Sequence, residues 1–277
     1  MITNCNDDIE EEIKIDIENI LLHLRIDGWH VEPGIIPSDE VDSVRKNIEM
    51  TSIPIGKKRQ GVDSAKGLMA KDQSLAPYLG HEGVLKVVEA FLGEHFKISF
   101  TTAIINNPGN ERGIWHSDWP FNQQNAGHIQ APYHDAVTHL TTIWMLSPFS
   151  AETGGTLIVP GSHRSNNNPT GEMEIDPLAP YPTEMHATGD PGSVLFFDSR
   201  LWHATATNFG IKPRVGVAVR FAPWWLNLDT LMPGSDIRNR IVDEVGGKEP
   251  EQELIPNDVF NYLPEKVKPL FRHWTIN

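Results

Sequence analysis

The chain has 277 residues, of which 39% are hydrophobic and 22% are charged, with 22 Gly and 21 Pro to form turns. This length and composition predict a globular protein, and we expect one core rather than two. The formal net charge of −14 argues against nucleic acid or an anionic membrane as partner, because both would be repelled, and it mildly favours a neutral or cationic substrate.

The N-terminus is acidic and carries neither the basic nor the apolar region of a signal peptide. No run in the chain approaches the ~20 apolar residues of a membrane span. The single cysteine, Cys5, excludes an intrachain disulfide and a cysteine-ligated metal site. We therefore expect a cytoplasmic protein whose partner is a small-molecule substrate. The sequence gives no sign of the oligomeric state.

The first 95 residues form a mainly helical lead-in, according to the spacing of their apolar side chains. The predicted elements are a helix over residues 9–24 that ends near Gly28, a short strand over 29–31, a helix that opens at 37–40, and a helix over 83–93. Ser38 is the predicted N-cap of the second helix. The segment from Lys57 to Asp72 is basic and has no clear periodicity, so we predict a loop or an edge of the mouth of an active site.

From Phe96 onward the period of the apolar residues changes to two, which is typical of strands. The predicted strands cover residues 96–104, 139–146, 156–160, 193–197 and 214–221. Residues 121–135 are rich in Asn, Gln and Gly, and we predict a loop there that is either a functional lid or disordered.

Many short strands with helices on the N-terminal side predict a mainly β fold with flanking helices (α+β). The core is expected to be a double-stranded β-helix, the jelly-roll of cupin-like proteins. We expect a single domain over residues 1–277, with the helical lead-in over 1–95, the β-helix core over 96–225 and a C-terminal extension over 226–277.

Two histidines and one aspartate form the strongest chemical pattern in the chain. His116 and Asp118 lie two positions apart, so on an extended strand both would project to the same face. His203 lies at the end of an apolar strand and supplies a third ligand. Two imidazoles and one carboxylate on one face of an octahedron leave three positions open, as in non-heme Fe(II) oxygenases. Arg214 enters another apolar strand, and a buried arginine requires an anion such as a carboxylate.

These residues, together with the segment 154–164 and the position of Arg214 eleven residues after His203, resemble the phytanoyl-CoA dioxygenase family of Fe(II)/2-oxoglutarate-dependent oxygenases. The resemblance covers roughly residues 28–225. It implies Fe(II) as the metal, 2-oxoglutarate and O2 as co-substrates, and the two histidines and the aspartate as catalytic metal ligands.

The same resemblance implies a site for 2-oxoglutarate. Arg214 would anchor the distal carboxylate, Thr205 would help to hold it, Thr156 would add a second polar contact, and Trp144 would form a wall of the pocket. Members of the family often carry a glutamine three positions before the first metal histidine, where this chain has Gly113. One contact to the co-substrate is therefore missing or comes from elsewhere.

The other histidines are predicted to be structural or exposed. His163 lies in a Pro-Gly-Ser-His turn and is expected to form a structural hydrogen bond. His128, His134 and His139 fall in or next to the predicted lid, where exposure at the surface is the default and contact with a substrate is the alternative. Trp115 has the opposite strand parity to the metal ligands, so it should point away from the metal.

The resemblance implies hydroxylation of an unactivated C–H bond of a small metabolite, as in the tailoring of nitrogen-containing natural products in secondary metabolism. A guanidine alkaloid of the cylindrospermopsin kind is one candidate substrate. Asp118 argues against halogenation, because related halogenases lack this carboxylate. The same ligands also serve desaturation, epimerisation or cyclisation. Two further classes stay open, namely a non-catalytic cupin-like protein that binds a metal or ligand, and a zinc hydrolase that needs neither O2 nor 2-oxoglutarate.

Overall fold

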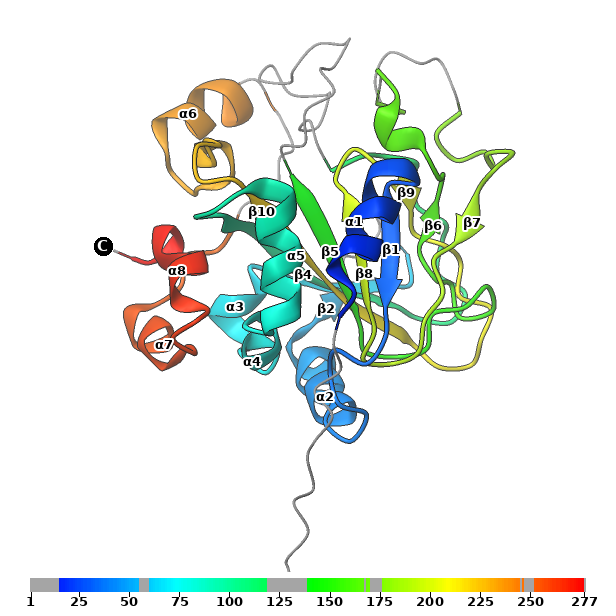
Figure 1. Ribbon diagram of the computed structural model, residues 1–277, viewed down its shortest axis with the longest axis horizontal. Coiled ribbons are helices and arrows are strands. Elements are labelled where there is room, and N and C mark those ends of the chain that lie inside the picture. The colour runs from blue at the N-terminus through cyan, green and yellow to red at the C-terminus, as the bar shows by residue number, and fades with distance from the viewer. Residues whose placement is uncertain are drawn as a thin grey trace, which may run out of the picture.

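The computed structural model describes residues 15–54, 60–118, 139–166, 168–169, 176–244, 246 and 252–276. Among these residues, seven strands form an antiparallel sheet in the order β1-β8-β5-β10-β4-β3-β2, and three form a second sheet in the order β7-β6-β9 (Figure 1). The strands are β1 (Trp29–Glu32), β2 (Ile53–Pro54), β3 (Val62–Lys66), β4 (Lys97–Asn106), β5 (Leu140–Met145), β6 (Leu157–Ile158), β7 (Met185–His186), β8 (Val194–Asp198), β9 (His203–Ala204) and β10 (Arg214–Ala222). The helices are α1 (Ile17–Ile26), α2 (Val41–Thr51), α3 (Leu68–Lys71), α4 (Ala76–Leu79), α5 (Glu82–Leu92), α6 (Asp236–Arg238), α7 (Asn257–Tyr262) and α8 (Lys268–Phe271).

Strand β10 lies between β5 and β4 in the larger sheet. One of its faces packs in the apolar core and the other lines a pocket. Val215, Val217 and Val219 are fully buried on one face, in the apolar cluster that the helices share. The residues that alternate with these valines, from Arg214 through Gly216 and Ala218 to Arg220, line a pocket on the other face. The alternation follows from the two-residue period of a strand. The predicted mainly β, jelly-roll fold with flanking helices is confirmed.

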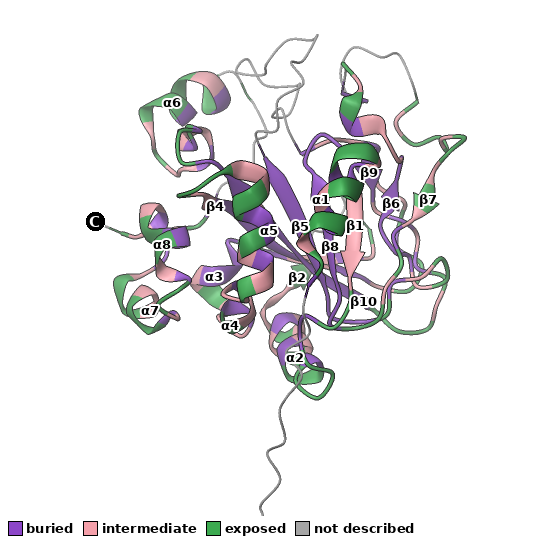
Figure 2. Ribbon diagram, in the orientation of Figure 1, coloured by how far each residue is buried: buried purple, intermediate pink, exposed green. Residues whose placement is uncertain are grey.

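Helices cover the apolar face of the larger sheet (Figure 1). Helix α5 buries one side, including Val84 and Val88, and exposes the other, as the buried and exposed stretches of its ribbon show (Figure 2). The same cluster takes Phe271 and Trp274 from the C-terminal extension, so helices are not confined to the N-terminal side as predicted. The single domain predicted for the whole chain stays a prediction. No helix in the described part of the chain is long and apolar enough to cross a bilayer.

Two predictions about the lead-in are wrong. The loop predicted from Lys57 to Asp72 contains strand β3, which pairs with β4, and the short helix α3. The sequence pattern did not predict this strand, because its buried and exposed residues do not alternate. Backbone pairing with β4 stabilises it instead. Helix α2 begins at Val41 rather than at Ser38, and the residue at its N-cap, Glu40, makes no side-chain capping bond.

Other predictions about helices and strands are met within the described residues. Helix α1 begins after Asp16, which accepts a capping hydrogen bond from the backbone N–H of Asn19 at 3.1 Å. The first six residues of the helix predicted over 9–24 lie outside the described residues. The predicted lid over 121–135, with His128 and His134, also lies outside them.

Gly28 joins α1 to β1 with a φ of +85°, and a Cβ there would lie 2.4 Å from Nδ1 of His163. Gly161 follows β6 with a φ of +78°, but a Cβ there would meet nothing within 4 Å. An alanine at either position is forced to a positive φ, which costs about 1–2 kcal/mol. At Gly28 it also overlaps the imidazole, which adds about 1–3 kcal/mol.

We therefore expect Gly28→Ala to lower the free energy of unfolding clearly more than Gly161→Ala does. Urea denaturation of both variants and of the wild type measures the difference. Equal losses in the two variants would mean that the close approach of Gly28 to His163 contributes nothing to stability.

Candidate metal centre

The two predicted histidine ligands lie directly opposite each other on neighbouring backbone segments. The N–H of His116 donates to the carbonyl of His203 at 3.1 Å, and the N–H of His203 donates to the carbonyl of His116 at 2.9 Å. Opposed residues of an antiparallel pair project to the same face, and the ring centroids are accordingly 4.2 Å apart. The strand predicted through His116 and Asp118 is reduced to this single bridge, because only His203 belongs to a named strand, β9.

Both imidazoles are held in the same tautomer. Nδ1 of His116 lies 3.0 Å from the carbonyl of Ile114, and Nδ1 of His203 lies 2.9 Å from the carbonyl of Leu201. Since a carbonyl oxygen only accepts, Nδ1 carries the hydrogen in each ring and Nε2 keeps its lone pair. Burial lowers the pKa of His203, which keeps that ring neutral. The two Nε2 atoms are therefore ready to bind a cation.

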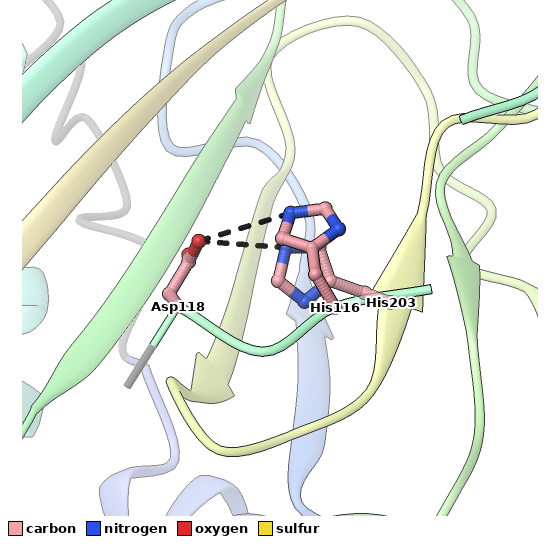
Figure 3. Close-up of side chains that lie close together, drawn as sticks. All are labelled: His116, Asp118 and His203. Carbon is pink, nitrogen blue, oxygen red and sulfur yellow. Dashed lines mark ion pairs between the residues drawn. The ribbon is translucent and has the colours of Figure 1, made fainter. Parts of the chain in front are cut away.

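Asp118 completes the group, with Oδ1 4.0 Å from Nε2 of His116 and 3.7 Å from Nε2 of His203 (Figure 3). Its backbone N–H donates to the carbonyl of Ser199 at 2.8 Å, which fixes the residue against the turn that follows β8. The three ligand atoms all lie within 4.8 Å of one another. Two imidazole nitrogens and one carboxylate oxygen on one side of a pocket are the donor set that suits Fe(II) with open positions.

A buried row of hydrogen bonds holds the second oxygen of this carboxylate. Thr141 donates to Oδ2 of Asp118 at 3.0 Å, and its Oγ1 lies 2.8 Å from Oγ of Ser199. The hydroxyl hydrogen of Thr141 is already used on the carboxylate, so Ser199 must be the donor in the second contact. Ser199 in turn lies 2.8 Å from Nδ1 of His139 and must accept from it.

The row ends at a distortion of strand β4. Nε2 of His139 lies 2.7 Å from Oγ of Ser99, and burial lowers the pKa of His139 to about 3, so this neutral ring accepts from the serine. Arg220 pairs with Phe100 whereas the next residue of β10 pairs with Ile98, which makes Ser99 an extra residue in a β-bulge. Bulges re-aim side chains beside functional sites. The predicted exposure of His139 is wrong, because this histidine is buried within the row.

Arg220 is a residue of the site that the sequence reasoning missed. Its guanidinium forms an ion pair with Oδ1 of Asp118. Burial alone would raise the pKa of Asp118, but Arg220 and then the two histidines outweigh it and hold the pKa well below its usual range. The missed signal was parity, because Arg220 lies six positions after Arg214 and therefore on the same face of β10.

Three of the four residues predicted to contact 2-oxoglutarate line the pocket of the metal ligands, namely Arg214, Thr205 and Thr156. Arg214 is buried, donates through Nε to the carbonyl of Gly154 at 3.2 Å, and lies 4.5 Å from the ring centroid of Phe149.

Gly216 leaves the room for this stacking of Arg214, because a Cβ there would lie 2.8 Å from the Phe149 ring. The end of the pocket beside Arg214 therefore offers a cation that is already oriented by its neighbours.

Trp144 does not wall this pocket. Its indole is fully buried in the cluster beneath the helices and donates to Oγ1 of Thr142 at 3.1 Å. The side chains of Thr141 and Ile143, which alternate with Thr142 and Trp144 along β5, face the pocket instead. The prediction was wrong because it rested on the residue type and not on the parity of β5, which places alternate residues on opposite faces.

Two further predictions concern the surroundings of the ligands. His163 is buried and its Nε2 lies 3.3 Å from the carbonyl of Arg25, which agrees with a structural role at a turn. Trp115 is buried away from the pocket and donates to the carbonyl of Ala179 at 2.9 Å. A Cβ at Gly113 would lie 3.1 Å from Cβ of Thr205, so a longer side chain there would crowd this threonine.

Comparisons with known proteins agree with this geometry. Residues 27–216 match the sequence profile described as phytanoyl-CoA dioxygenase (PhyH). The dioxygenase af480 of Aspergillus fumigatus is 24% identical over 220 residues, which span 75% of this chain and 67% of that protein. An uncharacterized protein of Mycobacterium tuberculosis is 26% identical over 228 residues, which span 77% of this chain and 78% of that protein.

Solved structures share the fold. The structure of HygX from Streptomyces hygroscopicus with nickel, 2-oxoglutarate and hygromycin B has a TM-score of 0.64 and 19% identity, and the match covers 84% of this chain and 96% of that chain. The epimerase SnoN in complex with Fe3+, alpha ketoglutarate and nogalamycin RO has a TM-score of 0.57 and 18% identity, with 75% and 83% of the two chains covered.

The row of hydrogen bonds leads to a prediction for metal affinity. Thr141→Val removes the donor to Oδ2 of Asp118 and leaves Arg220 alone to orient the carboxylate, so we expect Fe(II) to bind about 10- to 100-fold more weakly. Thr142→Val is the matched control, since Thr142 is the next residue of β5 but donates on the opposite face to the carbonyl of Val219 at 3.2 Å. Anaerobic titration with Fe(II) measures both affinities. Equal weakening in the two variants, or none in Thr141→Val, would contradict this role.

Proposed function

The chain belongs to the phytanoyl-CoA dioxygenase family, and on that basis we propose that this Fe(II)/2-oxoglutarate-dependent oxygenase hydroxylates an unactivated C–H bond of a small metabolite. The observation that carries the proposal is the meeting, in one pocket, of the His116, Asp118 and His203 ligands with the buried guanidinium of Arg214. A metal chelate and an anchor for a carboxylate are the two things that binding of 2-oxoglutarate requires.

In this proposal the two Nε2 atoms and Oδ1 of Asp118 hold Fe(II). When bound, Fe(II) and 2-oxoglutarate supply with O2 the oxidising chemistry that an unactivated C–H bond needs, and this chemistry belongs to the cofactor. The protein binds and orients. Arg214 pairs with the distal carboxylate of 2-oxoglutarate, a bidentate partner for its planar fork. Thr205 and Thr156 donate to the same molecule.

The apolar part of the pocket has a second task. Phe197 packs against the ring of His203 with centroids 4.9 Å apart, and Ile143 faces the pocket from β5. Both side chains belong to the apolar cluster that the two sheets enclose. A water-poor wall of this kind strengthens the ion pair of Arg214 and protects a reactive site from solvent.

For the substrate we propose a natural product that contains nitrogen, with a guanidine alkaloid of the cylindrospermopsin kind as one concrete candidate. Support comes from the ligands of similar structures, which are hygromycin B in HygX and nogalamycin RO in SnoN. Epimerisation and carbocyclisation are the alternative outcomes, because SnoN is an epimerase and SnoK from the same biosynthesis is a carbocyclase. A non-catalytic metal-binding protein is the alternative of another class.

Anaerobic addition of Fe(II) and 2-oxoglutarate to the metal-free protein should produce the weak visible charge-transfer band of the chelate. His203→Ala should lose the band, because it loses one of three ligands. Arg214→Ala should need about 30-fold more 2-oxoglutarate for half of the full band, since one partner of a buried charge pair is worth about 2 kcal/mol or more. His23→Ala, which changes an exposed histidine of α1, is the control.

The result has two readings. A band in the wild type, followed by succinate formation after oxygen is admitted, supports the oxygenase. Binding of iron without a band at saturating 2-oxoglutarate would overturn the proposal in favour of a metal-binding protein or a hydrolase.

A further inference from the structure

The pocket contains a second guanidinium that the proposed handling of 2-oxoglutarate does not use. Arg214 and Arg220 lie on the same face of β10, six residues apart, so that their Cα atoms are separated by roughly 20 Å along the strand. Between them the strand presents only Gly216 and Ala218 to the pocket. Arg214 thus lies at the end proposed for the distal carboxylate of 2-oxoglutarate, whereas Arg220 lies beside the metal ligand Asp118.

Arg220 is placed for a ligand and not for packing alone. Its side chain is 20% exposed, its guanidinium carbon lies 5.2 Å from the ring centroid of Phe100, and its charged end reaches Oδ1 of Asp118. Its Nε is buried and has no hydrogen-bond partner within the described part of the chain. A buried N–H of a charged group without an acceptor is costly, so an acceptor that arrives with a ligand would be favoured.

The formal charges of the pocket lead to the same conclusion. Among the described residues that line it, the charged side chains are Asp118, Arg214 and Arg220, and a histidine that binds a metal is neutral. The two arginines exceed the single carboxylate by one positive charge. Fe(II) and a dianionic 2-oxoglutarate cancel each other, so they leave this excess unchanged. A partly buried cation without a counter-charge is unfavourable.

Arg220 also shares an oxygen with the proposed metal. Oδ1 of Asp118 is the atom that faces both Nε2 atoms and the atom that pairs with Arg220. A divalent cation bound to Oδ1 repels the guanidinium and withdraws charge from the oxygen, so the ion pair weakens when the metal binds. The donors of Arg220 then become available beside the metal, where the substrate must lie.

We propose that Arg220 binds a singly charged anionic group of the substrate, a carboxylate or a sulfate ester, and so determines which molecules the enzyme accepts. This inference rests on the proposed oxygenase function. The anionic group would lie close to the metal, because Arg220 touches a ligand of the metal. The oxidised carbon is therefore within a few bonds of the anion. The net charge of −14 does not oppose this, since the local charge of a cavity, and not the distant surface, decides the binding of one small anion.

The test uses three probes with one phenyl ring, which are benzoate, phenyl sulfate and the neutral benzamide. Each is titrated anaerobically into the wild type loaded with Fe(II) and 2-oxoglutarate, and the change in the charge-transfer band is followed. We expect benzoate or phenyl sulfate to bind at least tenfold more tightly than benzamide, and the stronger of the two identifies the preferred anion.

Arg220→Gln should remove this preference when it is compared with the wild type at full development of each protein's own band, while Arg220→Lys should keep part of the preference because it retains the charge but loses the planar fork. Arg25→Gln, at an exposed position of α1, is the control and should bind like the wild type. Thermal unfolding of each variant reports whether the fold is retained.

Three outcomes would overturn the inference. Benzamide could bind the wild type as tightly as the anions do, or Arg220→Gln could keep the preference for anions. Arg220→Gln could instead lose the band itself while Arg220→Lys retains it, which would assign Arg220 to the metal or to 2-oxoglutarate. Absence of any band in the wild type is a different failure, because it removes the proposed oxygenase function together with this inference.

Discussion

The burial of one negative charge, the carboxylate of Asp118, determines the arrangement of everything around it. A buried carboxylate needs compensation from every side. Oδ1 receives the guanidinium of Arg220 and faces the two imidazoles, and Oδ2 receives the hydroxyl of Thr141. Each of these groups comes from a different part of the sequence, so the carboxylate can be satisfied only when the two sheets have come together. The site is therefore a product of the complete fold and not of one segment.

Because side chains alternate along a strand, the larger sheet has one face that packs in the core and one face that carries the residues of the site. On β10 the valines at 215, 217 and 219 pack under the helices, while the arginines at 214 and 220 face the pocket. A shift of the pairing by one residue would bury both guanidiniums in an apolar cluster and expose the valines to the cavity. The apolar cluster thus fixes the register, and the register places the charges. This coupling explains why a pocket with three charged side chains is compatible with a stable core.

Much of the fold and part of the site could be predicted from local patterns. The strands β4 and β10 carry two-residue periods, and β8 is a short apolar run. The His-x-Asp pair and His203 are recognisable as metal ligands from their residue types and spacing. The missed features depend on pairing. Trp144 was predicted as a pocket wall because it is aromatic, but its position in β5 directs it to the core face of the sheet. Strand β3 is stabilised by pairing with β4 and not by an alternation of apolar residues in its own sequence.

The row from Ser99 to Asp118 could not be predicted, because it combines a bulge in β4, a histidine before β5 and a serine after β8. Every hydrogen in that row points toward the carboxylate, and this direction has an electrical consequence. A proton that entered at Ser99 could pass to Asp118 by successive transfers along the row, because each donor already faces the next acceptor. One such passage reverses the row, so each hydroxyl must turn around and the histidine must return to its first tautomer before a second proton can follow the same route to the metal ligand.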